Sequence, residues 1–181
     1  PHNDFASYDY QPSVQALHML ENEASGGATV ITDGLAIAEA LRENSPEAFD
    51  VLQQVGVPHR QFDASTETFA IAPLLRLNEQ GRFVSLRFSN QLTQTLNPEH
   101  PRIQAFYMAY HALCEKVLDE RYSREFRLQG GEILIVAANR VLHSRRAIES
   151  KGARHLRDAY FDLDNVINKY YSLCRSQETS S

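Results

Sequence analysis

Residues 139–160, "NRVLHSRRAIESKGARHLRDAY", hold the clearest structural signal in this sequence. They follow the apolar run "GEILIVAA", and their pattern predicts two strands joined by the polar connection "ESKGA". We therefore predict a β-hairpin in which one strand ends near Arg146 and the next begins at Arg154. Adjacent antiparallel strands of this kind would place His143 and Arg154 side by side.

Short strand-like segments recur along the rest of the chain and are interrupted by helical patterns. Predicted strands cover 12–22, 28–34, 57–62, 68–77, 82–88, 123–129, 131–145 (split near Asn139) and 153–164. Predicted helices cover 34–44 (capped by Asp33), 46–55 (starting at Ser45-Pro46), 101–122 and 165–175. This order predicts a mainly β fold, a double-stranded β-helix (jelly roll) with helical insertions.

Length and composition limit the classes of protein that fit. The chain of 181 residues is 43% hydrophobic and 23% charged, which fits one globular domain over 1–175 with a polar tail over 176–181. A net charge of -5 argues against a nucleic-acid partner, and no apolar run is long enough for a membrane span. Cys114 and Cys174 lack CxxC spacing, so we expect reduced thiols and a cytoplasmic protein. Because the chain begins at Pro1 without a Met or a targeting signal, we expect that an upstream part of the catalytic domain is lacking.

Three side chains offer metal ligands in a pattern with a known chemistry. On an extended segment, His2 and Asp4 face the same side, and His143 adds a second imidazole. Two histidines and one carboxylate leave three open positions on iron, as in non-haem Fe(II) oxygenases. Two positions suit a 2-oxo acid and the third suits O₂, while Arg154 offers a rigid fork for the distal carboxylate of that acid.

Two other classes of function fit parts of the same pattern. A zinc hydrolase also uses His and Asp ligands with a bound water, although Arg154 has no role in it. A binding-only jelly roll is the other alternative. Activity with Zn(II) and without O₂ would indicate the first, and no Fe(II)-dependent visible absorption with 2-oxoglutarate would indicate the second.

Five stretches, in order, resemble the Fe(II)- and 2-oxoglutarate-dependent dioxygenases of the TauD/TfdA superfamily, and within it the γ-butyrobetaine hydroxylase-like branch. They are "HND" (2–4), "QPSVQALHMLENEASGGATVITDG" (11–34), "RFSN" (87–90), "GGEILIVAANRVLHSRR" (130–146) and "ARHLRDAYFDLD" (153–164). The resemblance spans nearly the whole chain and implies Fe(II), 2-oxoglutarate as co-substrate and O₂. It places the iron ligands at His2, Asp4 and His143, and the 2-oxoglutarate carboxylate at Arg154 and Thr29.

The resemblance also implies a substrate that carries a trimethylammonium group and an anion. Tyr160 matches a tyrosine of the aromatic cage around that cation, which is recognised by ring faces because it has no N–H. Tyr8, just after the metal pair, is a further candidate for the pocket wall. Asn3 replaces the family's usual threonine, and Ser89 replaces an asparagine that contacts the substrate carboxylate in carnitine-forming members.

A hydroxyl at Ser89 suits a tetrahedral phosphonate at least as well as a planar carboxylate, so the change favours 2-(trimethylammonio)ethylphosphonate. We expect this compound or γ-butyrobetaine as the small-molecule substrate, with trimethyllysine or another TauD-like substrate as the alternative. We expect hydroxylation coupled to the formation of succinate and CO₂. The amphipathic helices 101–122 and 165–175 also offer an interface, so we expect a homodimer.

Overall fold

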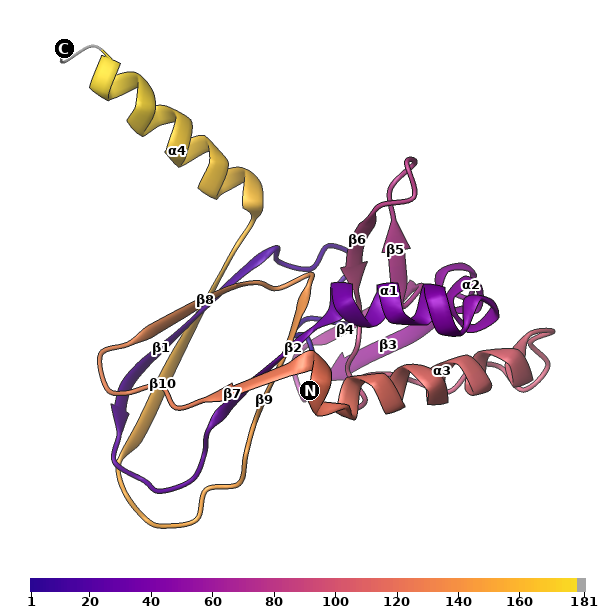
Figure 1. The fold of residues 1–181 in the computed structure, drawn as a ribbon, viewed down its shortest axis with the longest axis horizontal. Coiled ribbons are helices and arrows are strands. Elements are labelled where there is room, and N and C mark those ends of the chain that lie inside the picture. The colour runs from indigo at the N-terminus through magenta and orange to yellow at the C-terminus, as the bar shows by residue number, and fades with distance from the viewer. Residues whose placement is uncertain (179–181) are drawn as a thin grey trace.

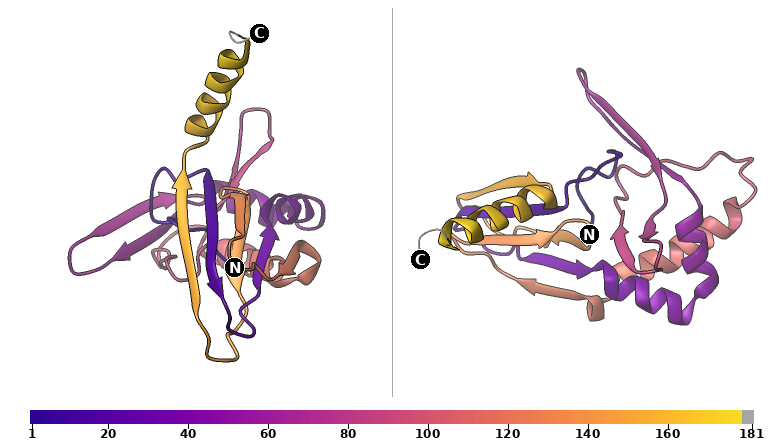
Figure 2. Two further views of the ribbon diagram at one scale, coloured as in Figure 1. Left: turned by 90° about the vertical axis from the view of Figure 1, so that its left-hand side faces the viewer. Right: turned by 90° about the horizontal axis from the view of Figure 1, so that it is seen from above.

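Two three-stranded antiparallel sheets form one half of the structure, a computed structural model that describes residues 1–178. Sheet I has the order β10–β1–β8, and sheet II has the order β7–β2–β9. Sheet I consists of β10 (Arg154–Phe161), β1 (Val14–Asn22) and β8 (Ile133–Ala137). Sheet II consists of β7 (Ser123–Phe126), β2 (Thr29–Asp33) and β9 (Val141–Arg145). Figure 2 shows the sheets as stacked layers, which confirms the mainly β, jelly-roll prediction.

The inner face of each sheet follows from the alternation of side chains along its strands. In β1, Gln15, Leu17 and Met19 are buried and share one face. Tyr160 of β10 pairs with Gln15, so β10 residues at even positions from 154 to 160 share that inner face. In sheet II, Ile31 pairs with His143.

A helical insertion between β2 and β7 forms the other half of the molecule, as Figure 1 shows. Its helices are α1 (Gly34–Asn44), α2 (Pro46–Gln54) and α3 (Ile103–Leu118), with the 3-10 turn η1 (Glu120–Tyr122). Its hairpins are β3 (Val57–Phe62) with β4 (Glu67–Ala72) and β5 (Leu75–Leu77) with β6 (Phe83–Leu86). The main core lies here, around Ile37, Leu52, Leu86, Phe106 and Leu113.

Asp33 joins the two halves and begins the first helix, as its position in the sequence predicts. Its Oδ1 accepts hydrogen bonds from the backbone N–H groups of Leu35 and Ala36 at 3.0 and 3.4 Å. Its carboxylate also binds Arg140, with Nη2–Oδ2 at 2.6 Å. The side chain of Ser45 makes no capping hydrogen bond to α2, so only the Pro46 part of that prediction holds.

The predicted hairpin between Arg146 and Arg154 is wrong. β9 pairs with β2 and β10 pairs with β1, so residues 146–153 cross from sheet II to sheet I. A polar, glycine-containing connection fits a crossover between sheets as well as a tight turn, and only tertiary pairing decides between them. Arg154 therefore lies opposite Asn22 rather than beside His143.

Several predicted boundaries also shift. The segment 68–77 forms two strands instead of one, and the helix predicted over 101–122 ends at Leu118 before η1. The last helix, α4 (Leu163–Glu178), extends away from the sheets (Figure 1) and includes residues 176–178 of the predicted polar tail. The rest of that tail, 179–181, lies outside the described residues. Both cysteines are free, as predicted.

Candidate metal centre

The N-terminal segment lies against β9 through a two-way backbone pairing of His2 with His143. His2 N–H donates to the His143 carbonyl at 3.0 Å, and His143 N–H donates to the His2 carbonyl at 2.9 Å. This antiparallel bridge brings the two imidazole rings to a centroid distance of 4.5 Å. The two predicted histidine ligands are therefore held together by the main chain.

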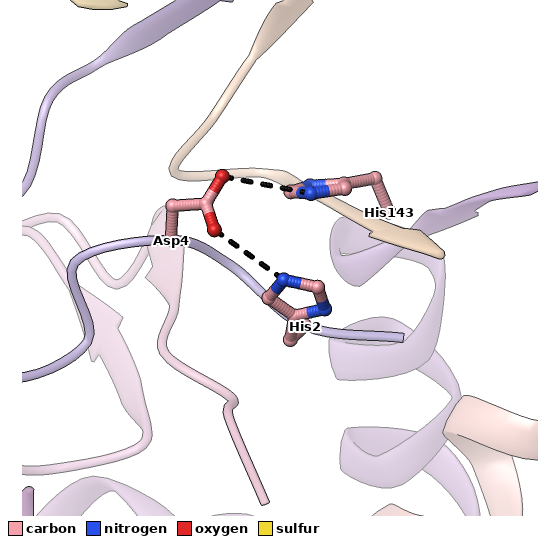
Figure 3. Close-up of side chains that lie close together, drawn as sticks. All are labelled: His2, Asp4 and His143. Carbon is pink, nitrogen blue, oxygen red and sulfur yellow. Dashed lines mark ion pairs between the residues drawn. The ribbon is translucent and has the colours of Figure 1, made fainter. Parts of the chain in front are cut away.

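Asp4 completes the cluster, as the spacing of His2 and Asp4 predicts. Asp4 Oδ1 lies 3.3 Å from His2 Nε2, and Asp4 Oδ2 lies 3.5 Å from His143 Nε2 (Figure 3). One ligand atom from each residue lies within 4.8 Å of the others, which is close enough for one ion. Two imidazoles and one carboxylate form the donor set of a mononuclear Fe(II) site with open positions, so these residues fit iron.

The protonation states of the cluster suit metal binding. Burial alone raises the pKa of Asp4, but hydrogen bonds from His2 and Tyr160, with the nearby histidine charges, outweigh it and lower that pKa to about 2. Burial lowers the pKa of His143, which favours the neutral ring. An ionised carboxylate and a neutral imidazole are the forms that bind a metal ion.

Two residues outside the cluster orient the Asp4 carboxylate. Gln15 Nε2 of β1 donates to Asp4 Oδ2 at 2.7 Å, and the Tyr160 hydroxyl of β10 lies 2.8 Å from the same oxygen. Gln15 is 2% exposed, and its amide also lies 3.2 Å from the Tyr160 hydroxyl. Sheet I therefore fixes the carboxylate, while sheet II contributes His143.

Asn3 anchors the segment between the two N-terminal ligands. Its Nδ2 donates to the carbonyls of Ala138 and Val141 at 2.8 and 3.3 Å, and its Oδ1 accepts from Phe88 N–H at 2.8 Å. A return backbone bond joins Asn3 N–H to the Phe88 carbonyl at 2.8 Å. The residue that departs from the family's threonine thus ties the metal segment to β9 and to the chain after β6.

The loop after Asp4 is held by a buried arginine. Arg87 Nη1 donates to the carbonyls of Ala6 and Tyr8, the second at 2.8 Å, and Nη2 reaches the Asp9 carbonyl at 3.4 Å. Arg87 is 4% exposed, so its buried guanidinium donates to the backbone carbonyls of this loop instead of to water. The loop contains Phe5, whose φ of 56° is unusual for a residue with a side chain.

Arg154 lies at the other end of the β10 inner face with an unsatisfied donor. Its Nε is buried and has no hydrogen-bond partner among the described residues. Burial and the charges of Arg145 and Arg127 lower the pKa of Arg154, so three cations meet here. A buried donor in a positive environment fits a carboxylate ligand such as one end of 2-oxoglutarate.

Thr29 lies in sheet II close to this positive end. It is buried and pairs with Arg145, which lies two residues after His143 on the same strand face. Gly27, at φ 65°, passes so close that a Cβ added there would lie 3.7 Å from Arg154 Nε. The structure therefore brings Thr29 and Arg154 toward one region through the 22–29 loop instead of through a hairpin.

Two of the predicted substrate residues, Tyr160 and Tyr8, contact the segment that carries Asp4. Tyr160 and Tyr8 both pack edge-on against the Phe5 ring, with centroid distances of 4.6 and 4.8 Å. Ser89 is buried and follows Phe88, the partner of Asn3. Tyr160 and Tyr8 are thus linked through an aromatic residue that the sequence analysis missed.

Sequence reasoning also missed the residues that support the ligands. Gln15 had a usable signal, since a polar residue occupies an inner position of the apolar strand "VQALHML". Arg87 and Phe5 had none, because their roles depend on the path of a loop.

A two-layer jelly roll with two histidines and one carboxylate on its inner side defines a class, the jelly-roll proteins with a facial metal triad. The chain belongs to one family of this class: the model of the family described as "Taurine catabolism dioxygenase TauD, TfdA family" matches residues 1–160.

Curated relatives agree with this assignment. The chain is 32% identical over 175 residues to γ-butyrobetaine dioxygenase of Pseudomonas sp. (strain AK-1), covering 96% of the chain and 46% of the relative. It is 27% identical to the human γ-butyrobetaine dioxygenase, covering 93% and 45%. It is 25% identical to the mitochondrial trimethyllysine dioxygenase of Rattus norvegicus, covering 92% and 41%. The chain thus spans about half the length of the curated relatives it matches.

Solved structures share the fold at lower identity. A putative α-ketoglutarate-dependent taurine dioxygenase from Burkholderia xenovorans matches with a TM-score of 0.72 at 18% identity, covering 88% of this chain and 56% of that one. The non-heme iron oxygenase OrfP, in complex with Fe and α-ketoglutaric acid, matches with a TM-score of 0.67 at 21% identity, covering 89% and 48%. Both matches support the jelly-roll fold.

Proposed function

We propose that this chain is the catalytic part of an Fe(II)- and 2-oxoglutarate-dependent hydroxylase that acts on a small trimethylammonium-bearing anion. The observation that carries the proposal is the cluster of His2, Asp4 and His143, whose ligand atoms lie within 4.8 Å of one another. We assign residues 1–175 to this catalytic domain.

The chain's own residues would bind the metal ion and orient its carboxylate ligand. His2, Asp4 and His143 would hold Fe(II) on one face, and Gln15 and Tyr160 fix the Asp4 carboxylate. When bound, iron supplies the oxidative chemistry: 2-oxoglutarate and O₂ give succinate and CO₂, and one oxygen atom enters a substrate C–H bond.

The positive end of the inner faces, around Arg154, would bind the co-substrate 2-oxoglutarate. The unpaired Nε of Arg154 suits the distal carboxylate of 2-oxoglutarate, and Thr29 lines the same region. A zinc hydrolase would leave this arginine without a role, so the arginine favours the oxygenase.

The substrate class rests on the relatives and on the aromatic residues. Relatives named γ-butyrobetaine dioxygenase and trimethyllysine dioxygenase support a trimethylammonium substrate. Tyr160, Phe5 and Tyr8 supply rings beside Asp4, and such rings attract a quaternary cation. Ser89 in place of an amide favours a phosphonate at the anionic end, as in 2-(trimethylammonio)ethylphosphonate. γ-Butyrobetaine is the second candidate, because relatives with that name match the chain at 32% and 27% identity. Trimethyllysine is the alternative.

A panel of these three substrates tests the proposal. The 181-residue protein is incubated with Fe(II), 2-oxoglutarate and each substrate in air, and succinate release is measured. We expect substrate-dependent succinate with at least one compound and none with His143→Ala. Turnover that survives His143→Ala, or hydrolysis with Zn(II) without O₂, would contradict the assignment.

We also propose a cytoplasmic homodimer. The two free cysteines support a reducing compartment. Among the described residues, no helix is long and apolar enough to cross a membrane. The exposed apolar side chains of α4, including Val166, Ile167 and Tyr170, support self-association. Sedimentation analysis of the wild type and of Ile167→Glu would test the dimer.

A further inference from the structure

The inner face of β10 carries charges of opposite sign at its two ends. Arg154, Leu156, Asp158 and Tyr160 alternate onto this face, because Tyr160 pairs with the buried Gln15 and Asp158 with the buried Leu17. Asp158 lies four positions after Arg154 on the strand, which corresponds to roughly 13 Å. The proposed 2-oxoglutarate carboxylate lies at the arginine end, so the aspartate end is left for another ligand.

Tyr160 links Asp158 to the metal cluster. The Tyr160 hydroxyl lies 2.6 Å from Asp158 Oδ2 and 2.8 Å from Asp4 Oδ2. A hydroxyl has one proton and donates to only one of these carboxylates at a time. Asp158 therefore brings a second negative charge to the tyrosine that contacts the metal carboxylate.

Among residues 1–178, the carboxylate of Asp158 makes no ion pair. The arginine ion pairs of this part of the chain involve other acids, such as Asp33 and Asp119. Asp158 is exposed, and beside it the Tyr160 ring packs on Phe5. An unpaired carboxylate next to aromatic rings suits a positively charged group.

We propose that Asp158 is a specificity-determining residue that provides the counter-charge for the cationic group of the substrate. The inference rests on the proposed function and adds a residue to it. A quaternary ammonium spreads its charge over its methyl groups and has no N–H to donate, so a nearby carboxylate attracts it without a directional hydrogen bond. A neutral group of the same shape gains nothing from Asp158.

An indirect role is the competing explanation, since Asp158 also contacts Tyr160. If Asp158 only orients the Tyr160 hydroxyl, its removal has no effect once that hydroxyl is absent. If Asp158 acts on the cation itself, its removal has the same effect with Tyr160→Phe. A double-mutant cycle separates the two roles.

The test compares two ligands that differ by one charge. γ-Butyrobetaine and its carbon isostere 5,5-dimethylhexanoate, in which a neutral tert-butyl group replaces the trimethylammonium group, are titrated by calorimetry into protein loaded with Fe(II) and 2-oxoglutarate under nitrogen. The proteins are the wild type, Asp158→Asn, Tyr160→Phe and the double variant. Asp164→Asn, in the first turn of α4, is the matched control.

We expect Asp158→Asn to raise the Kd of γ-butyrobetaine about tenfold relative to that of the isostere, with and without Tyr160→Phe. Asp164→Asn should leave both Kd values unchanged. An equal change for both ligands, no change, loss of the effect with Tyr160→Phe, or no binding of γ-butyrobetaine by the wild type would overturn the proposal. Succinate release in air tests the proposed function separately. If γ-butyrobetaine binding depends on Asp158 but no succinate forms, only the proposed function is contradicted.

Discussion

His2 and His143 are joined by two reciprocal backbone hydrogen bonds of 3.0 and 2.9 Å, although 140 positions separate them in the sequence. The pairing sets the two imidazoles side by side. Asn3 then fixes the turn toward Asp4 through the chain around Phe88 and Val141. The candidate site is therefore largely preorganised by the main chain, so its ligands and their supports can be tested separately.

Arg154 is the first target. We expect Arg154→Ala to raise the KM for 2-oxoglutarate about 10- to 100-fold, because a charge-assisted hydrogen bond contributes about 1.5–3 kcal/mol. Succinate release at varied 2-oxoglutarate measures it. Arg157→Ala is the control, since Arg157 pairs with His18 on the outer face of the same strand. Equal effects of the two substitutions would refute the assignment of Arg154.

Gln15 is the second target. Gln15→Leu keeps the size of the buried side chain but removes the amide that donates to Asp4 at 2.7 Å. We expect Fe(II) affinity to fall about 10- to 100-fold, because groups that orient a metal ligand contribute on this scale. Competition with a coloured chelator gives the affinity, and the exposed Gln94→Leu serves as the control. An unchanged affinity would show that the Gln15 contact is dispensable.

Asn3 affects stability as well as the site. Asn3→Ala leaves the buried N–H of Phe88 without its side-chain acceptor, so we expect the free energy of unfolding to fall by about 1–3 kcal/mol. Urea denaturation of the metal-free protein measures this change. Asn44→Ala removes a similar side-chain hydrogen bond at an exposed site, from Asn44 Nδ2 to the Ala40 carbonyl. It should lower the free energy of unfolding by less than about 0.5 kcal/mol. Equal costs would argue against the anchoring role.

His59 gives the fold a pH dependence apart from the site. Burial, with the Arg87 charge, lowers the pKa of His59 to about 4, from 6.5 in the unfolded chain. The unfolded state therefore binds more protons between these values, and stability falls as the pH drops from 6.5 to 4, by about 2–3 kcal/mol. Urea denaturation at several pH values in this range gives the free energy of unfolding as a function of pH. This free energy should change less steeply with pH in His59→Asn than in the wild type, and equal pH dependence would contradict the assignment.

Local patterns predicted most strands, and they predicted the residues that the structure brings together as candidate ligands. The alternation in β1, the cap at Asp33 and the His2–Asp4 spacing are all set by nearby residues, and each appears in the structure. The pairing of β9 with β2 was not predictable in this way, since a crossover and a hairpin share the same turn residues. The error concerned which strands are neighbours.

The supporting residues were harder to predict than the ligands. Gln15 contacts Tyr160 on a strand far away in the sequence, and Tyr160 in turn links Asp4 to Asp158. Arg87 holds a loop that no periodic pattern describes. Such roles become visible only when the sheets are assembled. The three candidate metal ligands could be predicted from the sequence because their residue types are chemically specific, and the structure brings them together.

The visible absorption of the protein with Fe(II) and 2-oxoglutarate under nitrogen tests the central claim most directly. A 2-oxo acid bound to iron through both its carboxylate and its keto oxygen gives a charge-transfer band, which requires the metal and the co-substrate on one site. We expect this band in the wild type and its loss in His143→Ala, with the Arg154→Ala band appearing only at higher 2-oxoglutarate. No band in the wild type, or an unchanged band in His143→Ala, would contradict the assignment of His2, Asp4 and His143 as the iron ligands.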